Sequence, residues 1–153
     1  MTLLVRTATE ADLPRLLPMM VDFNRMESIP WTFERGERAL RQLLGSAELG
    51  FVGLGEVDER TCGYFVLTFG YDLEWNGRDA FLTELYLVPE ARGRGLGRLL
   101  LGAAEATAEA RGTRALHLMV RPENATALAL YLGMGFREGT RRLLTKPLGG
   151  ADS

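Results

Sequence analysis

One segment of the chain has the composition of an anion-binding turn: Arg92-Gly93-Arg94-Gly95-Leu96-Gly97. It follows an apolar run that ends at Val88 and precedes apolar residues at helical spacing. Glycines let backbone N–H groups approach a ligand closely, and the unpaired donors and dipole at a helix N-terminus favour negative charge. The segment predicts a site for a phosphate or pyrophosphate, and the alternative is a tight strand-to-helix turn.

Two nucleotide-binding motifs do not fit this segment. Gly97 is followed by Arg98 and Leu99, so the Lys-Ser/Thr pair of a P-loop is missing. A dinucleotide fingerprint needs a third small residue at position 98 and an opening βαβ unit, whereas this segment lies mid-chain after predicted antiparallel strands. A nucleotide-binding domain is therefore kept only as a rival interpretation.

Three polar residues flank the segment at spacings that could serve a ligand. Glu84 shares one face of a predicted strand with Tyr86 and Val88, so its carboxylate can project into a cleft. Asn124 and Tyr131 are two helical turns apart, about 10 Å along one face, which suits one elongated ligand. The alternatives are an exposed or Arg-paired carboxylate at Glu84, a helix N-cap at Asn124 and a core tyrosine at Tyr131.

The elements that must position these residues follow from hydrophobic period, caps and turn residues. Strands are expected at residues 3–7, 50–57, 62–71, 81–88 and 116–120, with closing strands near Phe136 and over 141–146. Helices are expected over 13–20, 33–44, about 95–112 and 124–132. This order predicts a single α+β domain over residues 1–148, followed by a frayed tail at 149–153.

The composition excludes several classes of protein. The chain has 153 residues, 46% of them hydrophobic and 25% charged, as in an ordinary globular domain. With one cysteine, Cys62, and one histidine, His117, it predicts no disulfide, no Cys/His zinc site and no other metal. A net charge of −2 argues against nucleic acid and anionic membranes as partners. No signal peptide or 18-residue apolar stretch is found, so a cytoplasmic location is expected.

Three stretches in this order resemble the acyl-CoA-binding motifs of the GNAT family of N-acetyltransferases. They are Glu84-Leu85-Tyr86-Leu87-Val88-Pro89, then Arg92-x-x-Gly95-x-Gly97, then Asn124-x-x-Ala127-x-x-x-Tyr131-x-x-x-Gly135-Phe136. The resemblance covers residues 81–136 in motif detail and nearly the whole chain in element order. It implies a mixed, mostly antiparallel sheet of six to seven strands flanked by about four helices. The layout from Tyr64 to Val88 is also similar to that of diamine acetyltransferases.

The same resemblance implies acetyl-CoA as cosubstrate and assigns the residues that hold it. Backbone donors around Arg94 to Arg98 would hold the pyrophosphate, with Arg92 in a position usually occupied by Gln or Arg. Leu87 and Val88 would pair with the pantetheine arm as an added strand does, and one of their N–H groups would polarise the thioester carbonyl. The residues expected to bind the cosubstrate are Leu87, Val88, Arg92, Gly93, Arg94, Gly95, Leu96, Gly97, Arg98 and Asn124.

Transfer of an acetyl group to an amine needs a base and an acid. An alkylammonium with a pKa near 10.4 is protonated at neutral pH, so a base or a water chain must take its proton. We expect Glu84 to be that base or the anchor of the water relay, and Tyr131 to protonate the departing CoA thiolate. Thr83 stands where diamine acetyltransferases carry an acidic residue, so that role does not transfer directly.

The distribution of charge bears on the acceptor. Residues 1–91 carry 8 basic and 15 acidic side chains, whereas residues 92–153 carry 10 basic and 5 acidic. A small cationic amine, such as a polyamine or an amino-acid-like amine, is the simplest acceptor for the acidic half. The acidic and aromatic candidates are Asp22, Glu27, Glu34, Asp72, Glu74, Asp79, Trp31, Tyr71 and Trp75. Aminoglycosides, protein amines and a non-catalytic CoA-binding regulatory module are the alternatives, and the resembled family makes a homodimer possible.

Overall fold

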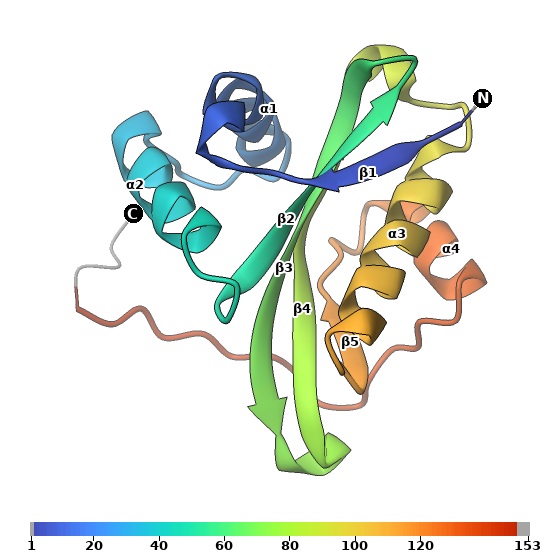
Figure 1. The fold of residues 1–153 in the computed structure, drawn as a ribbon. Coiled ribbons are helices and arrows are strands. Elements are labelled where there is room, and N and C mark those ends of the chain that lie inside the picture. The colour runs from blue at the N-terminus through green and yellow to red at the C-terminus, as the bar shows by residue number, and fades with distance from the viewer. Residues whose placement is uncertain (1, 150–153) are drawn as a thin grey trace. The chain divides into compact units, whose positions relative to one another are not determined.

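The computed structural model describes residues 2–149, which divide after Met119 into two compact units (Figure 1). The strands of the first unit are β1 (Leu4–Thr7), β2 (Gly50–Val57), β3 (Arg60–Asp72), β4 (Gly77–Leu87) and β5 (Ala115–Leu118). Its helices are α1 (Leu13–Met26), α2 (Phe33–Leu44) and α3 (Leu96–Ala110), and the second unit contains α4 (Ala125–Gly133). In the described residues, this is an α+β fold with five strands and four α-helices.

The strands form one mixed sheet in the order β1-β2-β3-β4-β5. All neighbours are antiparallel except β4 and β5, which are parallel. The β4–β5 pairing runs only from Asp79↔Ala115 to Leu82↔Leu118. Within residues 2–149, the last five residues of β4, 83–87, therefore have a strand partner on the β3 side only. This leaves backbone groups at the end of β4 without a neighbouring strand.

A bulge in β4 determines which side chains face α1. Val66 of β3 pairs with Glu84, but Leu67 pairs with Leu82, so Thr83 is the extra residue. A bulge re-aims the side chains around it. Thr83 is exposed, whereas Glu84 lies with Tyr86 on the sheet face that α1 covers.

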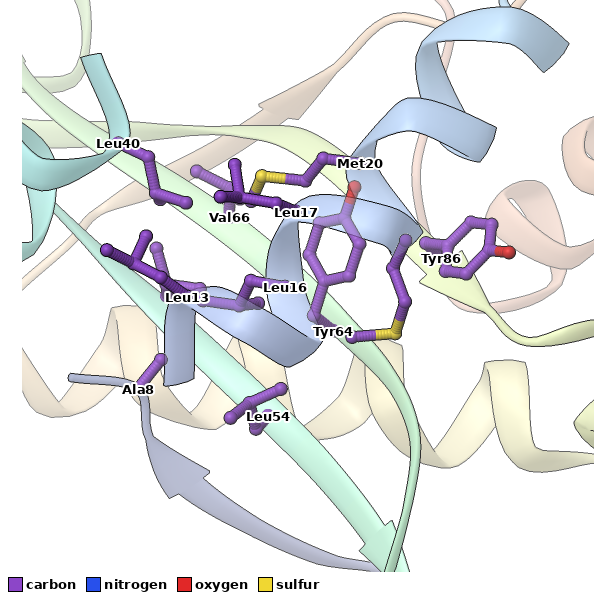
Figure 2. Close-up of a cluster of buried hydrophobic side chains, with 12 residues drawn as sticks. Ala8, Leu13, Leu16, Leu17, Met20, Leu40, Leu54, Tyr64, Val66 and Tyr86 are labelled. Atoms are coloured by element: carbon purple, nitrogen blue, oxygen red, sulfur yellow. The ribbon is translucent and has the colours of Figure 1, made fainter. Parts of the chain in front are cut away.

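Helices cover both faces of this sheet, as Figure 1 shows for the first unit. The main core lies between the sheet and the pair α1 and α2. Its buried members are Ala8, Leu13, Leu16, Leu17, Met19, Met20, Leu40, Val52, Leu54, Tyr64, Val66 and Tyr86 (Figure 2). On the other face, α3 buries Leu96, Leu100 and Leu101. Burial of apolar side chains at helical spacing on α1 and α3 explains why these segments form helices at these places.

The expected six to seven strands are wrong for the described chain, which has five. The predicted closing strands near Phe136 and over 141–146 are absent, because residues 134–149 include no strand. Leu143, Leu144 and Leu148 are 63%, 90% and 73% exposed. A strand is stabilised by a partner strand and a buried face, and this segment has neither.

Two further sequence expectations can be placed against the described chain. Apart from Gly149, the predicted frayed tail at 149–153 lies outside the described residues. None of the helices found within residues 2–149 combines the length and the apolar character that crossing a membrane requires.

Candidate active site

The glycine segment forms the turn that leads from the short 3-10 helix Pro89–Ala91 into α3. Gly93 and Gly95 have φ angles of 72° and 79°, which residues with a Cβ rarely adopt. A Cβ at either position would meet nothing within 4 Å, so backbone conformation rather than space requires glycine. Gly95 is the N-cap of α3 and offers no side-chain acceptor to the first turn. The first N–H groups of α3 can therefore meet an anion, as the sequence predicts.

The side chain of Arg92 lies between β4 and α1. Its Nε donates a hydrogen bond to the carbonyl oxygen of Leu87 at 3.0 Å, and its guanidinium stacks over the ring of Tyr86 with 5.4 Å to the centroid. Its Nη2 is 3.6 Å from Oδ2 of Asp22 and 3.4 Å from Sδ of Met26. In this structure the guanidinium predicted to serve the cosubstrate thus joins the end of β4 to α1.

The backbone groups of Leu87 and Val88 point in opposite directions. The Val88 N–H donates to the carbonyl oxygen of Cys62 at 2.9 Å, and the Val88 carbonyl accepts from the Ala91 N–H at 2.9 Å. Because direction alternates along a strand, the N–H and carbonyl of Leu87 face the side on which the end of β4 has no partner strand. Of the two residues, Leu87 is therefore the one whose backbone faces an open edge.

The carboxylate of Glu84 lies beneath α1 and accepts a hydrogen bond from one side chain. Its Oε1 accepts from the hydroxyl of Tyr64 at 2.7 Å, and no basic side chain within residues 2–149 forms an ion pair with it. Burial raises the pKa of Glu84, and the hydrogen bond from Tyr64 acts in the opposite direction. Glu84 is neither an exposed carboxylate nor one paired with arginine, so both alternatives considered from the sequence are excluded.

A second tyrosine–carboxylate pair lies beside the first. The hydroxyl of Tyr86 donates to Oδ2 of Asp22 at 2.5 Å, and Arg25 also bonds Asp22. Burial, followed by the hydrogen bond to Asp22, raises the pKa of Tyr86 to about 12. The bond from Tyr86 and the guanidinium of Arg25 lower the pKa of Asp22. Asp22 is therefore an ionised carboxylate whose charge is already compensated, which weakens its candidacy as a residue that attracts a cationic acceptor.

Two other titratable groups of the first unit lie outside this cluster. His117 hydrogen-bonds Asp79 between β5 and β4, with 3.1 Å from Nε2 to Oδ2, so it has a structural partner. Cys62 is buried, and burial raises the pKa of its thiol, which does not favour a thiolate nucleophile. Among residues 2–149, no group of three or more His, Cys, Asp or Glu side chains is placed to hold a metal ion.

Asn124 and Tyr131 belong to the second unit. The Oδ1 of Asn124 accepts from the Ala127 N–H at 3.2 Å, so Asn124 is the N-cap of α4. The ring of Tyr131 packs edge-on against Phe136 with 5.9 Å between centroids. The structure therefore brings Glu84, Leu87, Val88 and the segment from Arg92 to Arg98 together in one unit, while Asn124 and Tyr131 share the other.

Sequence reasoning missed the partners of Glu84 and Tyr86. Tyr64 stands 20 positions before Glu84, and Asp22 stands 64 positions before Tyr86. Tyr64 lies within an apolar strand and carries no local signal of a polar role. Only the register of β3 against β4 could have found it.

Comparison with known proteins gives consistent matches. The model of the acetyltransferase (GNAT) family matches residues 16–136. The ribosomal protein bS18 alanine N-acetyltransferase of Salmonella typhimurium is 33% identical over 123 residues, 77% of this chain and 72% of that protein. The thialysine N-epsilon-acetyltransferase of Bos taurus is 27% identical over 146 residues, 90% and 85% of the two chains. An integron cassette protein from the mobile metagenome of Cole Harbour Salt Marsh superposes with a TM-score of 0.83 at 32% identity, covering 95% and 90%.

Proposed function

This chain belongs to the acetyltransferase (GNAT) family, and on that premise we propose that it moves the acetyl group of acetyl-CoA directly to a primary amine. It is an N-acetyltransferase, and members of the family use acetyl-CoA. The observation that carries the proposal is the state of Glu84: a half-buried carboxylate with no cation partner among residues 2–149, close to the open edge of β4. Such a group suits removal of a proton from an acceptor amine.

The turn and the end of β4 fit the chemistry of acetyl-CoA. Gly93 and Gly95 expose backbone donors at the start of α3, which suits the pyrophosphate. Leu87 offers an N–H at an unpaired strand edge, which suits the amides of the pantetheine arm or the thioester carbonyl. The cosubstrate supplies the acetyl thioester, and this chain supplies its orientation. Asn124, through its side-chain amide donors, would bond the pantetheine arm from α4.

Proton transfers are assigned to two residues. Glu84 takes the proton of the acceptor ammonium, directly or through water, and the free amine attacks the thioester carbon. Because burial raises the pKa of Glu84, it is a stronger base than an exposed carboxylate would be. The C–S bond breaks, and Tyr131 gives its phenolic proton to the CoA thiolate. The nitrogen loses its second proton to solvent as it becomes the amide, and solvent returns a proton to the Tyr131 phenolate. This scheme requires the two units to act as one domain over residues 1–148.

A small cationic amine, polyamine-like or amino-acid-like, is the acceptor we propose. The thialysine acetyltransferases, whose name specifies an amino-acid side-chain amine, support this class over nearly the full length of the chain. Because the charge of Asp22 is compensated, Glu84 is the carboxylate of this tyrosine–carboxylate cluster that would meet the cation. A protein amino terminus is the second candidate, because a relative 33% identical is named for acetylation of a ribosomal-protein alanine.

A thiol-release screen tests the proposal. The full chain is mixed with acetyl-CoA and spermidine, thialysine, lysine, an aminoglycoside or a peptide that begins with alanine. We expect release with a cationic small amine, a loss of about 100-fold in kcat for Glu84→Gln, and no loss for the exposed carboxylate variant Glu109→Gln. Tyr131→Phe should lower kcat while leaving CoA affinity nearly intact.

The outcomes separate the rival functions. Release with the alanine peptide alone would favour the protein amino terminus. CoA binding without release across the whole panel would favour a regulatory module. Tighter binding of ATP or NAD than of CoA in calorimetry would favour a nucleotide-binding domain.

A further inference from the structure

The hydrogen bond between Tyr64 and Glu84 joins the neighbouring strands β3 and β4. In the register of β3 and β4, Tyr64 lies opposite Tyr86, and Val66 lies opposite Glu84. The phenol of Tyr64 therefore reaches diagonally to the carboxylate, where its hydroxyl lies 2.7 Å from Oε1. An O–H donor at this distance from a carboxylate makes a strong, charge-assisted hydrogen bond.

The surroundings of Tyr64 hold this donor in place. Its side chain is 0% exposed and belongs to the core under α1. Figure 2 shows its ring among the side chains of Leu16, Leu17 and Met20. The ring also stacks on Tyr86, with 5.6 Å between centroids and 29° between planes. A phenol packed in this way has little freedom to turn from Glu84.

Few other charges face this pair. Asp22 of α1 is a further carboxylate beside this pair; it accepts from Tyr86 and pairs with Arg25 and Arg92. The hydroxyl of Tyr86 donates its hydrogen bond to Asp22 and not to Glu84. Burial and the charge of Glu84 both raise the pKa of Tyr64, so Tyr64 stays protonated and acts as a donor. In the described chain, Tyr64 is thus the only side chain that hydrogen-bonds the Glu84 carboxylate.

We propose that Tyr64 is a positioning residue: its hydroxyl keeps the Glu84 carboxylate ionised and fixes its orientation toward the acceptor amine. The inference rests on the proposed role of Glu84 as base. Burial favours the protonated carboxyl, which cannot accept a proton, and the bond from Tyr64 favours the carboxylate. Without the hydroxyl, burial acts unopposed, and Glu84 must titrate at higher pH.

The first test needs no substrate. The Glu84 side-chain carboxyl carbon is followed by NMR during a pH titration of the full chain and assigned through Glu84→Gln. We expect Tyr64→Phe, which keeps the ring, to raise the titration midpoint by about one pH unit. Tyr86→Phe is the matched control, since it removes the neighbouring hydroxyl, and it should move the midpoint by less than half as much.

A second variant covers the case in which Tyr64→Phe does not fold. A 3-fluorotyrosine at position 64 is a stronger donor of nearly the same shape, so it should lower the Glu84 midpoint. A Glu84 midpoint unchanged by both substitutions, or moved equally by Tyr86→Phe, would overturn the inference whatever the turnover.

Kinetics connect the contact to catalysis. With acetyl-CoA and the best amine of the screen, Tyr64→Phe should move the acid limb of kcat/KM to higher pH by the same amount, without changing KM for acetyl-CoA. The effect should vanish in a Glu84→Gln background. A shifted NMR midpoint with an unmoved acid limb would uphold the control of Glu84 by Tyr64 and reject Glu84 as the base, so the two proposals fail separately.

Discussion

The hydroxyl of Tyr86 in β4 donates a hydrogen bond to Asp22 of α1 at 2.5 Å, and this contact joins positions 64 residues apart. Arg25 and Arg92 also contact the Asp22 carboxylate, so its charge is compensated within the chain. The contact orients Arg92, whose Nε also bonds the Leu87 carbonyl at 3.0 Å. Asp22 therefore acts in the structure as a link between α1 and the end of β4.

From this link we predict that Asp22→Asn changes stability and not electrostatic attraction of the acceptor. Loss of the charge that Tyr86, Arg25 and Arg92 contact should lower the midpoint of unfolding in a denaturant titration. The salt dependence of kcat/KM for a cationic amine should match the parent. Glu27→Gln, which changes a nearby carboxylate of α1's C-cap, is the comparison variant. A flatter salt dependence in Asp22→Asn alone would show that Asp22 attracts the acceptor.

Two glycine-to-alanine substitutions should have opposite effects. Gly95→Ala forces a Cβ into a φ of 79° and should cost about 1 kcal/mol of stability, with weaker CoA binding. Gly102→Ala, in the interior of α3 where a Cβ meets nothing within 4 Å, should stabilise the protein by about 0.5–1 kcal/mol. Thermal unfolding and calorimetric CoA titration measure both. Equal stability of the two variants would contradict the strain assigned to Gly95.

Two roles of Asn124 can be tested separately: its oxygen caps α4, and its side-chain amide is proposed to donate to CoA. Asn124→Ser keeps an oxygen for the Ala127 N–H but removes the amide donors, whereas Asn124→Ala removes both. We expect both variants to weaken CoA binding by about 5- to 10-fold, as the loss of one hydrogen bond implies, and only Asn124→Ala to lower the helicity of the second unit. If Asn124→Ser binds CoA as tightly as the parent, the proposed contact with CoA is rejected and Asn124 serves only as the N-cap of α4.

The raised pKa of Glu84 predicts how stability depends on pH. A folded-state pKa above the unfolded value gives stability that is present below the unfolded pKa, near 4.3 for Glu, and lost as pH rises through the folded value. Glu84→Gln removes this loss. We therefore expect its melting temperature to exceed that of the parent by more at pH 8 than at pH 4. A difference that is constant over this range would mean that the Glu84 pKa is not raised by folding.

Local sequence was enough to predict several parts of the molecule. The turn from Arg92 to Gly97, the helix that follows it and the N-cap at Asn124 depend on residues within a few positions of one another. Alternation along the strand predicted that Glu84 and Tyr86 share a face, and the structure confirms it. The resemblance to the GNAT family was confirmed by the family match over residues 16–136. It could be recognised from the sequence because those motifs are short and contiguous.

Tertiary structure alone decided what those residues contact. The hydrogen bonds Tyr64–Glu84 and Tyr86–Asp22 depend on strand register and on the docking of α1, neither of which is encoded by neighbours in sequence. The bulge at Thr83 and the burial of Glu84 beside Tyr64 also depend on strand register and on the docking of α1. The segment 136–146 shows the converse: its residue pattern favours strands, but a strand exists only where a partner completes its hydrogen bonds, and the described chain provides none there.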